Sequence, residues 1–313
     1  MIKSGGRDMK KFSSVDVVKG MSGVLAALVM VLSQPVSAEE VTLRYQGLTL
    51  NGERVMAEGK QMSDGILLLT HGTLAHNKME IIASLQELLA DSEVSTLAIN
   101  LSLGVDNRHG AYDCSVPHRH HHTDAIGEMS AWLDWLEGQG ATQIDLMGHS
   151  RGGNQLAWLL AEEDRPSIRK GVLLAPATWS EEKASKGYQK RYNKPLSELY
   201  EQATALVAAG KPKQMMGPVG FIYCSDSQVT AEAVVSYYRP DSRLNTPDLL
   251  PKIAKPLLVV EGSKDSVVGR IAEQSAGLNP DQFQFLMIDG AGHFFRDLYL
   301  DEVVEQIVEW LQG

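Results

Sequence analysis

The sequence LMGHSRGG, residues 146–153, places a serine between glycines in the pattern Gly148-x-Ser150-x-Gly152. Residues 143–147 before it (QIDLM) predict a short buried strand, and residues 152–164 (GGNQLAWLLAEED) have the apolar spacing of a helix. A serine between a strand and a helix sits on a strained turn with its hydroxyl above the sheet edge. The helix start adds free N–H groups and partial positive charge, which suit an anion formed beside the serine. A chain with 28 glycines can contain this motif by chance, so the interpretation depends on the strand–turn–helix context.

Apolar runs typical of buried strands alternate with segments of helical periodicity along most of the chain. Strands are predicted at 65–70, 94–101, 170–174, 256–260 and 283–288, and helices at 79–90, 123–137 and 301–311. Residues 41–59 alternate around Asn51-Gly52 and predict an opening hairpin. This order predicts an α/β fold with a mostly parallel sheet and helices on both faces. Right-handed crossovers would then bring the strand-to-helix loops to one edge of the sheet.

Residues 178–245 interrupt this alternation with polar, helix-prone sequence and no clear buried strand. The segment is too long for an ordinary loop and should carry structure of its own. We predict a small helical cap at about 178–250, inserted into a domain that spans residues 39–313. Its larger side chains either line a site or pack the cap onto the sheet: Tyr188, Tyr192, Tyr200, Met215, Met216, Phe221 and Tyr223.

A serine hydroxyl is a poor nucleophile at neutral pH and needs a base to take its proton. His293 is the best candidate because it lies in a glycine-rich loop (DGAGHFF, 289–295) directly after the last predicted strand. Asp265 follows the preceding strand in the motif GSKD (262–265) and is the candidate carboxylate that orients the histidine. The sequence therefore predicts a catalytic set of Ser150, Asp265 and His293.

The oxyanion of a tetrahedral intermediate needs backbone N–H donors close to the nucleophile. The N–H of Arg151 is one candidate, because it begins the helix after Ser150. The N–H of Thr73, after the 65–70 strand, is the second, with Leu74 as the alternative if the loop turns differently. The candidate side chains for substrate contact are His71, His149 and Phe294.

Four motifs together resemble the α/β-hydrolase fold superfamily over nearly the whole chain after residue 38: HG (71–72), GHSRGG (148–153), GSKD (262–265) and GAGH (290–293). The resemblance implies an eight-stranded sheet, a cap between the sixth and seventh strands, and hydrolysis through an acyl-enzyme without a cofactor or metal. A serine at position 150 argues against the dehalogenase and epoxide-hydrolase branches, which use aspartate there.

The superfamily includes esterases, lipases, thioesterases, peptidases and acyltransferases, so the fold leaves the substrate open. We predict a hydrolase of small-molecule carboxylic esters. An acyltransferase, thioesterase or peptidase would use the same three residues and is the alternative. A non-catalytic exported protein that binds a metal or other ligand is the alternative from another class.

The N-terminal residues have the pattern of a secretory signal peptide. A basic leader precedes the apolar run 24–32 (VLAALVMVL), and Val36-Ser37-Ala38 supplies the small residues of a cleavage site. We predict cleavage after Ala38, and a periplasmic or secreted protein. Nine apolar residues are too few to span a bilayer, so no stable membrane anchor is expected after cleavage. A formal net charge of −10 gives no support to nucleic-acid binding.

The loop 103–123 contains one of the two cysteines and a cluster of histidines. Cys114 and Cys224 either form one disulfide in an oxidising compartment or remain half-buried thiols. The histidines precede a predicted helix: His118, His120, His121 and His122. They could bind a metal, contact substrate or pack against the cap, and we favour packing.

Overall fold

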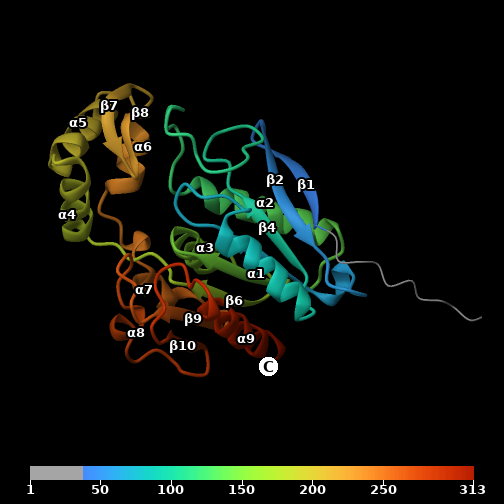
Figure 1. Cartoon of the computed structure of the whole chain (residues 1–313). Helices are drawn as coiled ribbons and strands as arrows, with labels where there is room; N and C mark the ends of the chain where they lie inside the picture. Colours follow the sequence, from blue (N-terminus) through green and yellow to red (C-terminus); the bar gives the residue numbers. More distant parts are fainter. Residues whose placement is uncertain (1–37) are drawn as a thin grey trace, which may run out of the picture. The chain divides into compact units, whose positions relative to one another are not determined.

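Eight strands form one mostly parallel sheet in the computed structural model, which describes residues 38–313 (Figure 1). The strand order is β1-β2-β4-β3-β5-β6-β9-β10, and only the pairs β1–β2 and β2–β4 are antiparallel. The strands are β1 (Ala38–Tyr45), β2 (Leu48–Val55), β3 (Ile66–Thr70), β4 (Thr96–Asn100), β5 (Ile144–His149), β6 (Ile168–Leu174), β9 (Leu257–Gly262) and β10 (Phe283–Ile288). The predicted sheet is thereby confirmed. The predicted signal peptide lies outside the described residues, except for Ala38.

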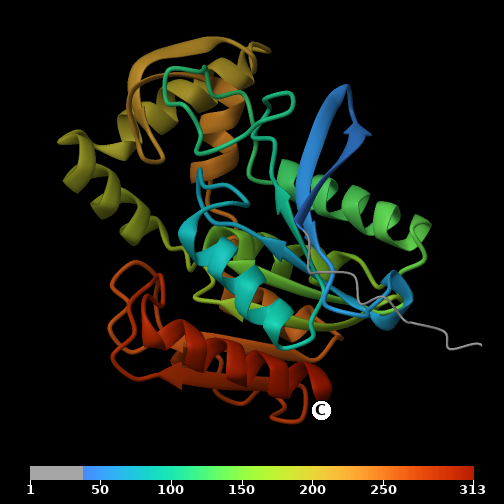
Figure 2. The ribbon, with the colours of Figure 1, turned by 45° about the vertical axis from the view of Figure 1, so that its right-hand side comes forward.

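Helices cover both faces of the sheet, as predicted. On one face α2 (Asp124–Gly138) and α3 (Arg151–Glu162) pack together, and on the other α1 (Glu80–Asp91) packs beside α9 (Leu298–Gln312) (Figure 2). Side chains alternate along a strand, so Leu68 contributes to the α2/α3 core while its neighbours Leu67 and Leu69 contribute to the α1/α9 core. Burial on both faces explains why β3 reads as a continuous apolar run.

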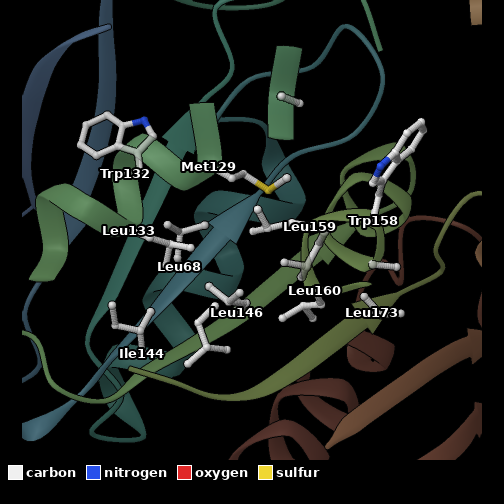
Figure 3. Close-up of a cluster of buried hydrophobic side chains, with 14 of the residues drawn as sticks. Leu68, Met129, Trp132, Leu133, Ile144, Leu146, Trp158, Leu159, Leu160 and Leu173 are labelled. Carbon is white, nitrogen blue, oxygen red and sulfur yellow. The ribbon is translucent and has the colours of Figure 1, made fainter. Parts of the chain in front are cut away.

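The α2/α3 face contains the largest buried side chains of the domain. Figure 3 shows Trp132 and Met129 of α2 and Leu159 of α3 near strand residues such as Leu68 and Leu146. All five are buried, with at most 1% of their surface exposed. This packing fixes α3, and therefore the turn at its start, against the sheet.

The opening hairpin turns at a different place from the predicted one. Gln46 and Gly47 connect β1 to β2, and both have positive φ angles (46° and 86°), as a tight hairpin turn requires. Asn51-Gly52 instead lies inside β2. A Cβ on Gly52 would approach the Leu97 side chain of β4 to 3.1 Å. The prediction was wrong because the approach of another strand, rather than a turn, explains this glycine.

The segment between β6 and β9 contains a cap with a buried core of its own within residues 188–237, and it is not purely helical, in contrast to the prediction. Leu244, Leu249 and Leu250, inside the predicted bounds of 178–250, pack instead in the α2/α3 core. Helices α4 (Glu181–Tyr192), α5 (Leu196–Ala208) and α6 (Ala231–Tyr238) pack with a hairpin of β7 (Met215–Phe221) and β8 (Cys224–Thr230) (Figure 1). The hairpin escaped prediction because β7 contains two glycines and a proline and β8 is mostly polar. β6 and β9 are the sixth and seventh strands of the main sheet in chain order.

Short helices complete the described chain. They are η1 (Met62–Asp64), η2 (Ser242–Leu244), α7 (Thr246–Leu249), η3 (Leu250–Lys252) and α8 (Ile271–Gln274). Within residues 38–313, no helix combines the length and apolar character needed to cross a bilayer.

The loop 103–123 is attached to the cap by covalent and backbone contacts. Cys114 and Cys224 form a disulfide, so the first of the two alternatives for the cysteines is correct. His118 forms an isolated β-bridge with Val229 of β8, and its carbonyl accepts a hydrogen bond from the Thr230 N–H at 3.0 Å. The packing interpretation of the histidine-rich loop is therefore confirmed.

Candidate active site

Ser150 lies at the turn between β5 and α3, as predicted from the motif. Its backbone angles (φ 55°, ψ −120°) are strained for a residue other than glycine. A Cβ at Gly148 would lie 2.5 Å from the Gly152 carbonyl oxygen, and one at Gly152 would lie 2.3 Å from the His71 carbonyl oxygen. Both motif glycines are therefore required by close backbone contacts around this turn.

The structure brings the three predicted residues Ser150, His293 and Asp265 together. The Ser150 hydroxyl donates to His293 Nε2 at 2.9 Å, and His293 Nδ1 donates to Asp265 Oδ2 at 2.7 Å. These two hydrogen bonds require that the neutral His293 ring carries its proton on Nδ1. The side chains of His293 and Asp265 are 6% and 5% exposed. The resulting geometry is that of a nucleophile, a base and a carboxylate that orients the base.

The surroundings of Asp265 favour its ionised form. Burial opposes ionisation, but the hydrogen bond from His293 and the N–H groups of Val267 and Val268 outweigh it, so the pKa of Asp265 is lowered. These N–H groups donate to Oδ1 at 2.7 and 3.2 Å, which leaves Oδ2 for the histidine. Asp265 is therefore a carboxylate at neutral pH and can stabilise a protonated imidazole.

The loop that contains Thr73 lies against the nucleophile. A Cβ on Gly72 would be 3.1 Å from the Cβ of Ser150. His71 Nδ1 donates to the Gly72 carbonyl at 2.9 Å. Because the C=O and N–H of a trans peptide point in opposite directions, this bond directs the Thr73 N–H away from the His71 ring. The role of the Thr73 and Arg151 N–H groups as oxyanion donors stays a prediction.

Two of the three side chains predicted to contact substrate are instead buried supports. His71 is 1% exposed, its Nε2 accepts from the Leu101 N–H at 3.1 Å, and burial, assisted by the nearby Arg108, lowers its pKa to about 3. His149 is 2% exposed and its Nε2 donates to the His293 carbonyl at 3.0 Å. The prediction was wrong for both, because each ring is enclosed and bonded to backbone. Phe294, which is 41% exposed, lies beside His293, and its contact with substrate stays a prediction.

The Arg151 side chain connects the nucleophile turn to the loops around it, a role that the sequence does not predict. Its Nε donates to Thr73 Oγ1 at 2.9 Å and its Nη1 donates to His122 Nδ1 at 3.2 Å. The guanidinium carbon lies 5.1 Å from the centre of the Tyr237 ring. One side chain thereby contacts the Thr73 loop, the histidine-rich loop and the cap. Nothing in the local sequence signals this role.

The buried histidines of the loop 103–123 form a neutral network under the cap. His118 Nδ1 and His120 Nε2 lie 3.1 Å apart, and His120 Nδ1 lies 2.8 Å from the Tyr237 hydroxyl. Burial lowers the pKa of His118 to about 4, and burial together with Arg151 lowers that of His122 to about 3. Across residues 38–313, no three His, Cys, Asp or Glu side chains are grouped as metal ligands.

Comparison with known proteins agrees with this fold. A sequence model of the alpha/beta hydrolase family matches residues 66–308, and the chain belongs to that family. The chain is similar to YheT of Escherichia coli (strain K12), a protein provisionally named an esterase, with 26% identity over 192 residues. The alignment covers 56% of each protein, so it spans little more than half the length of this curated relative.

Solved structures share the fold at low sequence identity. Est1E from Butyrivibrio proteoclasticus, solved with bound ferulic acid, has a TM-score of 0.60 and 19% identity, covering 87% of this chain and 98% of that one. The Pyrococcus furiosus esterase Pf2001 has a TM-score of 0.59 and 18% identity, covering 88% and 91%. At this level of identity the likeness establishes the fold.

Proposed function

We propose that this protein is a serine hydrolase that cleaves carboxylic esters. The observation that supports the proposal most strongly is the continuous hydrogen-bonded chain from Ser150 Oγ through His293 to Asp265. The choice of an ester as substrate is supported by the names of similar proteins, since YheT and Pf2001 are both named as esterases.

In the proposed reaction, His293 Nε2 removes the hydroxyl proton as Ser150 Oγ attacks the ester carbonyl carbon. The carbonyl oxygen becomes an oxyanion and accepts hydrogen bonds from the Arg151 and Thr73 N–H groups. His293 then gives its proton to the leaving alcohol while ionised Asp265 stabilises the imidazolium. Water, deprotonated by the same histidine, then attacks the carbonyl carbon of the acyl-enzyme. The bond to Ser150 Oγ breaks, His293 returns the proton to Oγ, and the acid is released.

Turnover of para-nitrophenyl esters of increasing acyl length tests this proposal. We expect release of nitrophenol by the wild-type chain, with an acyl length optimum set by the space near Ser150. Ser150→Ala should abolish turnover without a change in melting temperature, because the half-buried Ser150 hydroxyl contributes little to packing. Equal turnover by the Ser150→Ala variant would reject the assigned nucleophile.

We also infer that residues 1–38 are a signal peptide and that residues 39–313 form an exported enzyme. The Cys114–Cys224 disulfide supports this inference, because structural disulfides persist mainly in oxidising compartments. Cleavage after Ala38 would remove only the first residue of β1. Mass spectrometry of protein from the periplasmic or culture fraction should find Glu39 at the N-terminus. An intact N-terminus in the cytoplasm would contradict the inference.

A further inference from the structure

A cavity of about 230 Å³ lies between the cap and the loops that hold the proposed catalytic residues. Two of its lining residues connect it to the site. Arg151 directly follows Ser150, and the Val267 N–H donates to Asp265 Oδ1 at 2.7 Å. Much of the remaining wall comes from α4 and from tyrosines of the cap. Arg151 and Val267 place the cavity beside the proposed catalytic residues.

The charged side chains that line this cavity are all positive. Within residues 38–313, its lining contains three cations, Arg151, Lys183 and Arg191, and no carboxylate. Their partners are neutral: Arg191 Nη1 donates to the Ile222 carbonyl at 3.0 Å, and Lys183 Nζ donates to Thr178 Oγ1 at 3.5 Å. In the described part of the chain none of the three forms an ion pair.

Several arginines elsewhere in the protein do have carboxylate partners. Arg165, Arg169 and Arg243 each pair with an aspartate or a glutamate. The chain as a whole carries a formal net charge of −10. Three cations with no carboxylate around one cavity create a local positive field in a protein with an excess of acidic side chains.

The neighbouring polar groups do not offset this charge. Burial raises the pKa of the Tyr237 and Tyr238 hydroxyls, so both phenols stay neutral. His122, which accepts from Arg151, is also neutral at physiological pH, because burial and Arg151 hold its pKa at about 3. A bound anion would supply the negatively charged partner for the three cationic side chains. Arginine is well suited to bind a carboxylate through paired hydrogen bonds.

We propose that this cavity binds a carboxylate of the substrate, so that the ester cleaved at Ser150 carries a second, negatively charged group held by Arg151, Lys183 and Arg191. This inference rests on the proposed function and names its substrate class. The carboxylate can belong to the acyl part or to the alcohol part of the ester, and these two sources are distinguished by experiment.

The test compares two charged esters, each with its uncharged methylated twin. Mono-para-nitrophenyl adipate carries the carboxylate on the acyl side, and para-carboxyphenyl acetate carries it on the alcohol side. We expect kcat/KM for one charged ester to exceed that of its twin by about tenfold or more, as for hydrogen bonds between charged groups. The preference should fall as salt is raised from about 0.05 to 0.5 M, because the cations are partly solvated.

A pair of double variants tests whether the effect is local. Lys183→Gln/Arg191→Gln should lose the preference while turnover of the uncharged twins changes by less than about twofold. Lys190→Gln/Lys194→Gln removes the same charge from exposed positions near α4 outside the cavity lining, and should keep the preference. Arg191→Lys retains the positive charge and should therefore retain most of the preference for the charged ester.

Calorimetry with adipate alone measures the same interaction without catalysis. We expect adipate to bind the wild-type chain and not the Lys183→Gln/Arg191→Gln variant. Equal turnover of the charged and uncharged esters together with no adipate binding would overturn the inference. An equal loss of the preference for the charged ester in both double variants would overturn it as well. If the uncharged esters are turned over in that case, the proposed hydrolase function stands. If no ester is turned over and a fluorophosphonate does not label Ser150, the proposed hydrolase function is rejected. In that case adipate binding would still show whether the cavity binds a carboxylate.

Discussion

The edge of the main sheet and the cap are held in place by different kinds of structure. At the sheet edge, Ser150, Asp265 and His293 each follow a strand of the same sheet, and helices pack on both faces of it. The cap has a small core of its own and is attached to the loop 103–123 by one disulfide and a short backbone bridge. The proposed chemistry thus depends on a continuous frame, whereas the cavity beneath the cap depends on a few separate attachments.

The largest effect should come from the sheet edge. Asp265→Asn should reduce kcat by about ten-thousand-fold, because an amide no longer holds the required tautomer of His293 or stabilises its cation. Steady-state turnover of a nitrophenyl ester measures the effect, and the melting temperature serves as the control. A loss below about tenfold would show that Asp265 does not act on His293.

Acid should weaken both regions, since each contains buried neutral histidines. At the sheet edge burial lowers the pKa of His71 to about 3 and that of His149 to about 4, and beneath the cap the values are about 4 for His118 and about 3 for His122. Unfolded chains bind these protons near pH 6.5, so stability falls as the pH drops from 6.5 toward 4. Each group costs about 1.4 kcal/mol per pH unit in that window. Glu128 has the opposite effect on stability, because burial raises its pKa to about 7. Its contribution to stability increases as the pH falls from about 7 to 4.5.

Denaturant unfolding at several pH values between 7 and 4 measures this loss. His118→Asn should make the fall in stability shallower, because one titrating group has been removed. A stability that does not change across this range would contradict the buried neutral state of these histidines.

The sequence predicts the sheet edge far better than the cap, for physical reasons. Ser150, Asp265 and His293 each follow an apolar run, and glycines mark the turns beside them. The runs before Ser150 and Asp265 are fully buried strands, whereas β10 before His293 is an edge strand that is buried only in part. The β7–β8 hairpin has no such run, and its stability depends on cap contacts that lie far apart in sequence.

Side-chain roles that depend on tertiary contacts were not predictable either. His71 and His149 sit next to functional positions in the sequence, yet their rings point into the protein and support backbone. The Arg151 side chain reaches His122 of the loop 103–123, and no local pattern encodes that contact.

Removal of the disulfide should separate the two regions. Cys114→Ser/Cys224→Ser should lower the free energy of unfolding by about 2–4 kcal/mol, because the bond closes a long loop in the unfolded chain. Guanidinium unfolding measures the loss. Fluorophosphonate labelling in the folded variant should persist, since the bond does not touch the catalytic residues. Loss of labelling in a folded variant would show that the cap supports the site itself.

The smallest effect should come from a glycine of the cap. Gly187 lies inside α4 with open space around its missing Cβ, so Gly187→Ala should raise the free energy of unfolding by about 0.5–1 kcal/mol through helix propensity. Gly152→Ala at the sheet edge is the contrasting variant and should be strongly destabilising, because its Cβ would meet the His71 carbonyl. Equal effects of the two substitutions would remove the distinction between a tightly packed edge and an open cap surface.

Covalent labelling distinguishes an activated nucleophile at Ser150 from an ordinary serine hydroxyl. The folded chain is incubated with a fluorophosphonate, and the modified peptide is located by mass spectrometry, with Ser150→Ala and His293→Ala as controls. We predict one adduct per chain on Ser150, absent from Ser150→Ala and strongly slowed in His293→Ala. If the folded wild-type protein remains unlabelled, or if the Ser150→Ala variant is labelled equally, Ser150 is not the activated nucleophile.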